Sequence, residues 1–379
     1  MTVDYFPYRD YEMPAGVNRH SDALTQDKYT DPALFAAEMD KIFSNDWVTV
    51  GRAGQIPNPG DYFTAMVGTR PVIIMRQDDG TIHAMGNFCL HRYARLLEGA
   101  GNTGRIMCPY HHWTYLRSGK LIGVPDRKGF ERDKLADRKL LPLSCDVALG
   151  FIFVSLRDDL EAPSARLKAL DGLIGNFDLG AYEDHHVVHE EVWNGNWKLL
   201  IENFIESYHT TYTHVGSIGP TNPTNLAEFG PVGDPAFAIH SNSYRDEDLP
   251  AIHNPRLTEE EKRRFYVISL FPNGLAAVDP NFVWWMALEP LGPGRSNARW
   301  GLSYAPETMA GSSDAEGFRD TIRKVIETAT EEDKEMVERI QDGCGFGAQA
   351  PGILHGPLEV NVREFNDYLT RKLEPQPGV

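Results

Sequence analysis

Cysteine is scarce in this chain, at four of 379 residues. A secreted scaffold held by disulfides needs a far higher proportion, so that class of protein is excluded. Long apolar runs are also missing: the best candidate, residues 149–156, falls well short of the roughly 20 residues of a membrane helix. No basic segment followed by an apolar core opens the chain, so we expect no signal peptide. These absences predict a cytoplasmic protein with no membrane partner.

Basic residues are also few: the chain has 37 Lys and Arg residues and 54 Asp and Glu residues, which gives a formal charge of −17. Such a surface repels phosphates, so we expect no nucleic acid partner. Apolar residues make up 41% and charged residues 24% of the chain, a composition that excludes a largely disordered protein. At about 150 residues per domain, the length predicts two or three domains.

The distribution of short strands divides the chain into two regions. Between Trp47 and Leu156, β-rich runs alternate with clusters of Gly, Pro, Asn and Asp, which predicts a small all-β domain. The remainder mixes strands, at 266–271 and 282–288, with helices such as 315–340. The chain is therefore expected to be α+β, with two domains that span residues 45–157 (all-β) and residues 1–44 with 158–379 (mixed).

Two clusters in the first domain each pair one cysteine with one histidine. They are Cys89-Leu90-His91 and, sixteen residues later, Cys108-Pro109-Tyr110-His111. A Rieske [2Fe–2S] centre needs two thiolates on one iron and two imidazoles on the other, so two loops that deliver one of each would clamp it from both sides. Tetrahedral zinc is the alternative, although zinc fingers usually pair Cys with Cys and His with His. The spacing favours the iron–sulfur cluster.

A glycine motif between these clusters matches a dinucleotide-binding pattern by letters alone. Residues 99–104 read G-x-G-x-x-G, but neither a preceding strand nor a following helix is expected there. We interpret the segment as a surface turn. Because no nicotinamide or flavin fold is recognisable, electrons are expected from a partner protein.

A second constellation lies on a strongly amphipathic helix expected to run from Trp197 to Tyr208. One line of this helix carries Glu202, Glu206 and His209, and His214 follows five residues later. Five residues turn an ideal helix by about 500°, which would leave the two imidazoles about 140° apart. They can share a metal only if the helix ends or bulges between them, as the intervening β-branched threonines favour.

Two histidines and one carboxylate form the usual set for non-haem Fe(II), with positions left open for O₂. We select Asp333 as the carboxylate, because it shares an apolar helical stripe with Met336, Val337 and Ile340. A carboxylate on an inward face is costly unless it is paired, and a metal would pair it. The alternative is that Asp333 caps a helix that starts at Thr330, with Glu331 and Glu332 as favourable charges of its first turn.

These motifs carry a family resemblance that runs from about residue 47 to residue 341. The pair C-x-H-R and C-P-Y-H-x-W, at 89–92 and 108–113, resembles the Rieske domain of ring-hydroxylating oxygenase α subunits. The segments 196–214 and 332–338 are similar to the catalytic domain of the same family. Tyr93 departs from the pattern, since Gly or Ala often follows the His-Arg pair.

The resemblance implies a helix-grip, START-like catalytic domain with a central antiparallel sheet, and it implies the ligands of both metal sites. For the [2Fe–2S] cluster these are Cys89, His91, Cys108 and His111. For the mononuclear Fe(II) they are His209, His214 and Asp333. Glu206 stands where many members carry a carboxylate that links a cluster histidine of one subunit to an iron histidine of the next, which is the basis for expecting a homotrimer.

The function implied is that of a terminal oxygenase that hydroxylates a small organic substrate with O₂. Electrons would come from NAD(P)H through a flavin and iron–sulfur reductase, with or without a ferredoxin; a separate β subunit remains open. An aromatic ring is the favoured substrate. Oxidative N-demethylation or hydroxylation of a quaternary ammonium compound is the alternative, and a Rieske electron-transfer protein without oxygenase activity is the alternative of another class.

The substrate pocket is expected between the loop 215–245 and the strands of 266–288. Arg245 is a candidate anchor for a carboxylate, and Trp284 or Trp285 for a cation. Other eye-catching residues are expected to be structural: surface histidines at 185, 186 and 189, and free thiols at 145 and 344.

Overall fold

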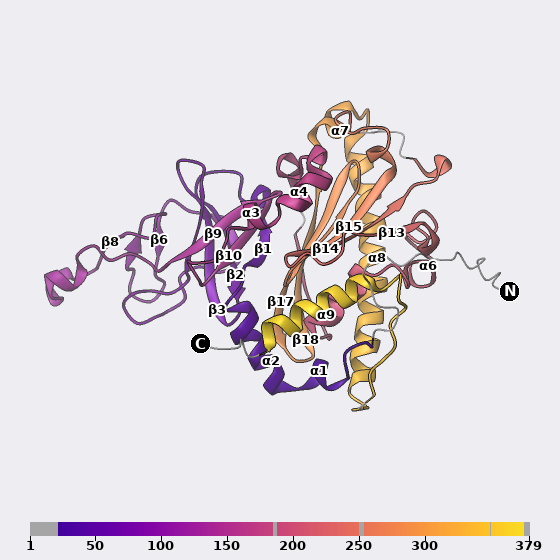
Figure 1. Cartoon of the computed structure of the whole chain (residues 1–379). Helices are drawn as coiled ribbons and strands as arrows, with labels where there is room; N and C mark the ends of the chain where they lie inside the picture. Colours follow the sequence, from indigo (N-terminus) through magenta and orange to yellow (C-terminus); the bar gives the residue numbers. More distant parts are fainter. Residues whose placement is uncertain (1–21, 185–187, 250–253, 349, 375–379) are drawn as a thin grey trace.

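The computed structural model describes residues 22–184, 188–249, 254–348 and 350–374. A β-rich part, drawn in indigo and purple, lies beside a larger part in which helices cover a long sheet (Figure 1). This arrangement confirms the expected α+β class. Within the described residues no helix is long and apolar enough to cross a membrane.

The β-rich part consists of a seven-stranded antiparallel sheet and a small three-stranded sheet that extends from it. The large sheet has the order β1-β10-β9-β4-β3-β2-β5, and β6-β7-β8 form the small one. The bounds are β1 (Val48–Arg52), β2 (Asp61–Val67), β3 (Arg70–Arg76), β4 (Ile82–Gly86), β5 (Ala100–Asn102), β6 (Ile106–Met107), β7 (Thr114–Tyr115), β8 (Leu121–Gly123), β9 (Pro142–Ala148) and β10 (Phe151–Ser155).

The larger part is built on a second antiparallel sheet, with the order β11-β18-β17-β16-β15-β14-β13 and β12 paired to β18. Its strands are β11 (Glu183–Asp184), β12 (His189–Trp193), β13 (Ala227–Phe229), β14 (Phe237–Ser243), β15 (Arg264–Leu270), β16 (Gly274–Val278), β17 (Phe282–Gly292) and β18 (Arg295–Tyr304). The helices are α1 (Asp27–Thr30), α2 (Pro32–Glu38), α3 (Pro163–Arg166), α4 (Lys168–Ile174), α5 (Trp197–Ile205), α6 (Thr210–Thr213), α7 (Pro306–Gly311), α8 (Ala315–Cys344) and α9 (Val360–Leu373).

Both faces of this second sheet are buried, and the alternation along β17 shows how. Phe282, Trp284 and Met286 face a core that they share with α5, α8 and α9. Val283 and Trp285 face the opposite core, which contains residues of α4 and of β10. The period-two pattern of a strand therefore sorts successive side chains between two cores. The helix-covered face is the one that carries the site described below.

Three sequence-based interpretations are wrong in detail. The helix that starts at Trp197 ends at Ile205 and does not reach Tyr208. Helix α8 begins at Ala315, capped by Asp314, so residue 330 does not start a helix and the capping role for Asp333 is excluded. The glycine segment 99–104 is not simply a turn, because Ala100–Asn102 forms the edge strand β5 and pairs with β2.

Candidate metal centre and substrate pocket

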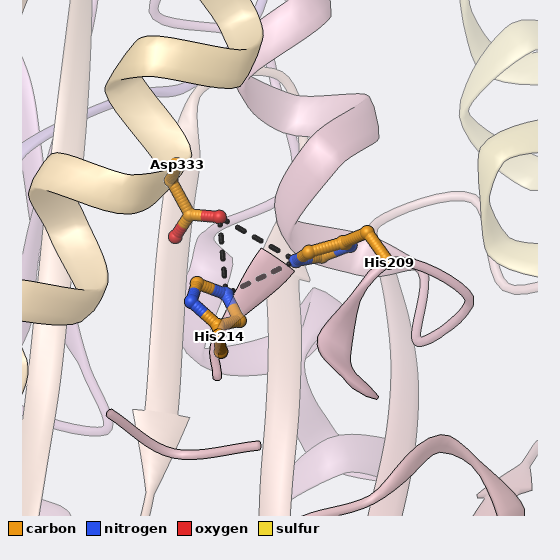
Figure 2. Close-up of side chains that lie close together, drawn as sticks. All are labelled: His209, His214 and Asp333. Atoms are coloured by element: carbon orange, nitrogen blue, oxygen red, sulfur yellow. Dashed lines mark hydrogen bonds and ion pairs between the residues drawn. The ribbon is translucent and has the colours of Figure 1, made fainter. Parts of the chain in front are cut away.

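The two histidines of the second constellation flank one short helix. Glu206 ends α5 in an extended backbone conformation. His209 then directly precedes α6, and His214 directly follows it. The helix thus breaks before His209, at Glu206. The expectation that the threonines between the two histidines cause the break is wrong, because Thr210–Thr213 is itself helical. The break turns the imidazoles toward each other, with their Nε2 atoms 3.2 Å apart (Figure 2).

Asp333 reaches the same point from the middle of α8. Its Oδ1 lies 3.4 Å from Nε2 of His209 and 3.2 Å from Nε2 of His214. One donor atom from each of the three residues falls within 4.8 Å of the others, so a single ion can contact all of them. Two imidazole nitrogens and one carboxylate oxygen are a donor set that suits Fe(II) and leaves coordination positions open.

Each of the three side chains is oriented by a further polar group. Glu206 Oε1 lies 2.5 Å from Nδ1 of His209, and Glu332 Oε2 lies 3.0 Å from Nδ1 of His214. Asn203 Nδ2 donates to Asp333 Oδ1 at 2.8 Å. Carboxylates on the outer nitrogen fix the tautomer of a ligating imidazole and raise its basicity. Sequence analysis anticipated Glu206 but missed Glu332, because neighbours in a helix point about 100° apart and carry no mark of sharing a site.

The charges of this centre also suit a cation. Burial acts to raise the pKa of the Asp333 carboxyl, but His214 and His209 hold it well below its usual range. For His209, burial acts to lower the pKa, yet Glu206 and Asp333 raise it to about 10. Without a metal, protons on the imidazoles balance the carboxylates. A divalent ion would displace those protons, as metal binding generally does.

The cysteine–histidine clusters form two loops with the same backbone. In each loop the residue four after the cysteine has a positive φ, 63° at Tyr93 and 56° at His112, and its N–H donates to the cysteine carbonyl. This left-handed position explains why Gly is common where this chain has Tyr93. The loops bring Nδ1 of His91 to 3.1 Å from Nδ1 of His111.

The thiols of the two loops lie beneath these imidazoles. Cys89 and Cys108 are both 1% exposed, whereas His111 is exposed. Burial raises the pKa of the Cys89 thiol, the hydroxyl of Tyr115 lowers it, and the neighbouring Cys108 thiol raises it further. Two buried sulfurs and two neighbouring imidazole nitrogens are the donor set of a Rieske [2Fe–2S] cluster.

A cavity of about 230 Å³ opens beside the His209, His214 and Asp333 side chains. Its walls come from the expected segments, with Ile218 and Asn222 from the loop and Val267 and Trp284 from the sheet. Phe204 stacks on Trp284 with the ring centroids 4.5 Å apart. Helix α8 supplies a wall that sequence analysis did not predict, formed by Phe318, Ile322, Val325, Ile326, Ala329 and Thr330.

Comparison with known proteins decides the family. The family described as "Ring hydroxylating alpha subunit (catalytic domain)" matches residues 178–375, and the "Rieske [2Fe-2S] domain" matches residues 46–137. The glycine betaine monooxygenase oxygenase subunit of Chromohalobacter salexigens is 30% identical over 405 residues, which cover 91% of this chain and 84% of that protein. The chain belongs to the ring-hydroxylating Rieske oxygenase family.

Two further relatives show the breadth of this oxygenase family. The toluate 1,2-dioxygenase α subunit of Pseudomonas putida is 34% identical over 230 residues, or 58% of this chain and 50% of that one. The crystal structure of CntA, a quaternary ammonium Rieske monooxygenase, superposes with a TM-score of 0.80 at 20% identity and covers 94% of this chain and 96% of that chain. This oxygenase therefore has the fold and the two iron cofactors of its family: a Rieske [2Fe–2S] cluster and a mononuclear iron.

Of the three residues proposed from the sequence as substrate anchors, only one lines the cavity. Trp284 lines the cavity, but Trp285 faces the opposite core. Arg245 is not among the described residues that line the cavity; its side chain is 46% exposed and pairs with Asp248. The sequence-based role of Arg245 as a carboxylate anchor is therefore wrong.

The remaining histidines and cysteines have no metal-site geometry among the described residues. His189 is partly buried, since its ring stacks on Trp300 with centroids 3.9 Å apart. His185 and His186 lie outside the described residues. Cys145 and Cys344 are free thiols, as expected.

Proposed function

We propose that this chain is a terminal oxygenase in which His209, His214 and Asp333 hold the mononuclear Fe(II). Cys89, His91, Cys108 and His111 hold the [2Fe–2S] cluster in this proposal. The observation that carries it is the convergence of three ligand atoms beside an apolar cavity. When bound, the iron supplies O₂ activation, and the cluster passes on electrons that a flavin and iron–sulfur reductase takes from NAD(P)H.

The chain's own residues position the substrate and the ligands. Phe204 and Trp284 form an aromatic wall that holds an organic substrate next to the three ligating side chains and excludes water. Glu206 and Glu332 keep the ligating nitrogens of His209 and His214 directed at the shared point. These contacts preorganise the site before the substrate enters.

The two proposed centres lie far apart within one chain. In Figure 1, β6, which directly precedes the Cys108 loop, lies on the left side of the molecule, and α6 lies on the right side. We infer that the cluster of a neighbouring subunit serves this iron, with Glu206 between that neighbour's exposed His111 and His209 of this chain. A closed ring of three subunits satisfies every site in this way. Because its electrons start from NAD(P)H, we place the enzyme in the cytoplasm.

Metal and sulfide analysis of the purified holoenzyme tests this function. We expect three irons and two acid-labile sulfides per chain, because two irons belong to the cluster and one to the second site. Two irons with two sulfides would instead indicate an electron-transfer protein. Zinc in place of sulfide would contradict both assignments, and such a protein would be colourless.

A further inference from the structure

The end of the cavity away from the proposed iron ligands is polar. His240 and Asn242, on β14, and Tyr244, just beyond that strand, alternate along its cavity-facing side. His240 lies near His209: burial lowers the pKa of His240, and the charge of His209 acts to lower it further. Four residues of extended chain then place Tyr244 about 13 Å farther along. Asp279, which follows β16, meets it there: the Tyr244 hydroxyl donates to Asp279 Oδ2 at 2.7 Å.

Asp279 is a buried carboxylate with no cationic partner in the described part of the chain. It is 3% exposed, and its other oxygen accepts from the N–H of Asn281 at 2.8 Å. No lysine or arginine is found among the described residues that line the cavity. Burial raises the pKa of Asp279 to about 6, so the group is largely ionised near neutral pH.

The other carboxylates that line the cavity are already engaged. Glu206 contacts His209, and Asp333 contacts both proposed histidine ligands. Asp248 Oδ2 lies 2.7 Å from Nε of Arg245. Burial of a carboxylate without an opposite charge is unfavourable. Of the four described carboxylates that line the cavity, Asp279 is the one without a cationic partner.

Unused hydrogen-bond acceptors surround the same end. The side-chain oxygens of Asn222 and Asn242 are buried and have no hydrogen-bond partner. Both asparagines line the cavity near Tyr244: burial raises the pKa of the Tyr244 hydroxyl, Asn222 is close enough to act to lower it, and the Asn222 backbone carbonyl accepts from Asn242 Nδ2 at 3.4 Å. Buried acceptors are normally paired, and oxygen acceptors require N–H or O–H donors.

We propose that Asp279, with the Asn222 and Asn242 oxygens, binds the ammonium group of a protonated primary or secondary amine substrate. This inference rests on the proposed function, because it takes the cavity to be the substrate site. The ammonium supplies the missing positive charge and up to three N–H donors, and the aromatic walls favour a cation further. It places the nitrogen at the far end of the cavity and the carbon skeleton toward the iron ligands. An aromatic carboxylate would instead meet Asp279 as a like charge.

A structural role for Asp279 also exists, since its bond to the Asn281 N–H closes the β16–β17 turn. Asp279→Asn keeps the acceptor for that bond and removes the charge, and it replaces the oxygen that accepts from Tyr244 by an amide nitrogen. Asp248→Asn is the matched control, because it makes the same change in a carboxylate of the same cavity that Arg245 already pairs.

The proposal is tested by calorimetric binding to the holoenzyme at about pH 7.5, where Asp279 is ionised. The four probes share a phenyl ring and differ in its polar substituent: they are benzylamine, benzyl alcohol, benzoate and benzyltrimethylammonium. We expect benzylamine to bind at least about 10-fold more tightly than each of the other three. Asp279→Asn is expected to raise its Kd by about 10- to 100-fold, and Asp248→Asn by less than about threefold.

Equal binding of benzylamine and benzyl alcohol, or tighter binding of benzoate, would overturn the amine site. Equal binding of the trimethylated probe would overturn the role of the two asparagine oxygens. If Asp279→Asn does not fold, the probe series on the unaltered protein still decides. Iron and sulfide analysis of the same sample distinguishes the amine site from the proposed oxygenase function. Three irons per chain without amine selectivity would refute only the amine site. Two irons per chain with amine selectivity would refute only the oxygenase function.

Discussion

The imidazole of His209 faces a carboxylate through each of its ring nitrogens. Nδ1 is close to Glu206, and Nε2 is close to Asp333. Of these two carboxylates, only Asp333 also contacts His214 at the proposed metal position, so Asp333 and Glu206 have different roles. Asp333 completes the proposed donor set, and Glu206 orients the ring.

Glu206→Gln therefore should keep both metal sites but lose more than about 90% of substrate-dependent O₂ uptake, because the neutral amide cannot follow charge changes at the cluster. Iron, sulfide and O₂ uptake are measured on one preparation. Glu202→Gln is the control: it is the same substitution on α5, but Glu202 accepts from the Tyr29 hydroxyl at 2.8 Å and lies off the metal site. Full activity of Glu206→Gln would refute the bridging role.

The pH dependence of amine binding follows from Asp279. Its pKa is raised by burial to about 6, so the ionised form that attracts an ammonium is present above pH 6 and is lost below it. Two tyrosines interact with Asp279, and burial raises the pKa of both Tyr244 and Tyr182, so neither titrates in that window.

Benzylamine affinity should thus be constant from about pH 7 to 8 and fall toward a tenfold loss per unit well below pH 6. Calorimetric titration across this range measures it, and Asp279→Asn should show no such step. An affinity that improves on acidification would contradict the assigned carboxylate.

At the scale of elements, helix α5 is held to the N-terminal segment by a buried ion pair. Lys198 Nζ lies 2.5 Å from Glu38 Oε1, with the two side chains 1% and 0% exposed. The indole Nε1 of Trp197 donates to the other Glu38 oxygen at 2.9 Å. Because α5 ends at the metal site, this pair places the start of the segment that carries both histidines.

Lys198→Met should lower the free energy of unfolding by about 3–5 kcal/mol, because it leaves the Glu38 carboxylate buried and unpaired. Urea denaturation followed by far-UV circular dichroism measures the loss. The double variant Lys198→Met with Glu38→Leu should recover most of it. A loss below about 1 kcal/mol in the single variant would show that the pair contributes little.

At the scale of the whole molecule, β6, beside the Cys108 loop, and α6, beside the proposed iron ligands, lie on opposite sides (Figure 1). This separation is the reason to expect that electron transfer requires assembly of several subunits. A chain that reduces its own iron would have to pass electrons from the side that carries β6 to the side that carries α6. In the ring that we propose, the exposed His111 of one copy would lie near Glu206 of the next.

Co-expression of two inactive variants tests this arrangement. Cys108→Ser should lack the cluster, and Asp333→Ala should lack the mononuclear iron. With equal expression and random assembly, each mixed ring has one productive interface of its three, which is about a quarter of all interfaces, so O₂ uptake should return to about a quarter of the wild-type value. Mixing the two purified oligomers without subunit exchange is the control. No recovery in co-expressed rings would indicate electron transfer within one chain.

The sequence alone determined the local chemistry of this protein. The paired cysteine–histidine loops, the histidines at 209 and 214 and the acidic helix position at 206 are recognisable because each group is short and its spacing reflects its backbone. Tertiary packing decided what no local pattern carries: the meeting of Asp333 with residues more than a hundred positions earlier, the contact of Glu332 with His214, the wall contributed by α8, and the unpaired carboxylate of Asp279. These side chains come together only because a sheet and three helices enclose one core, and the charge and hydrogen bonds of a buried group depend on neighbours that are distant in the chain.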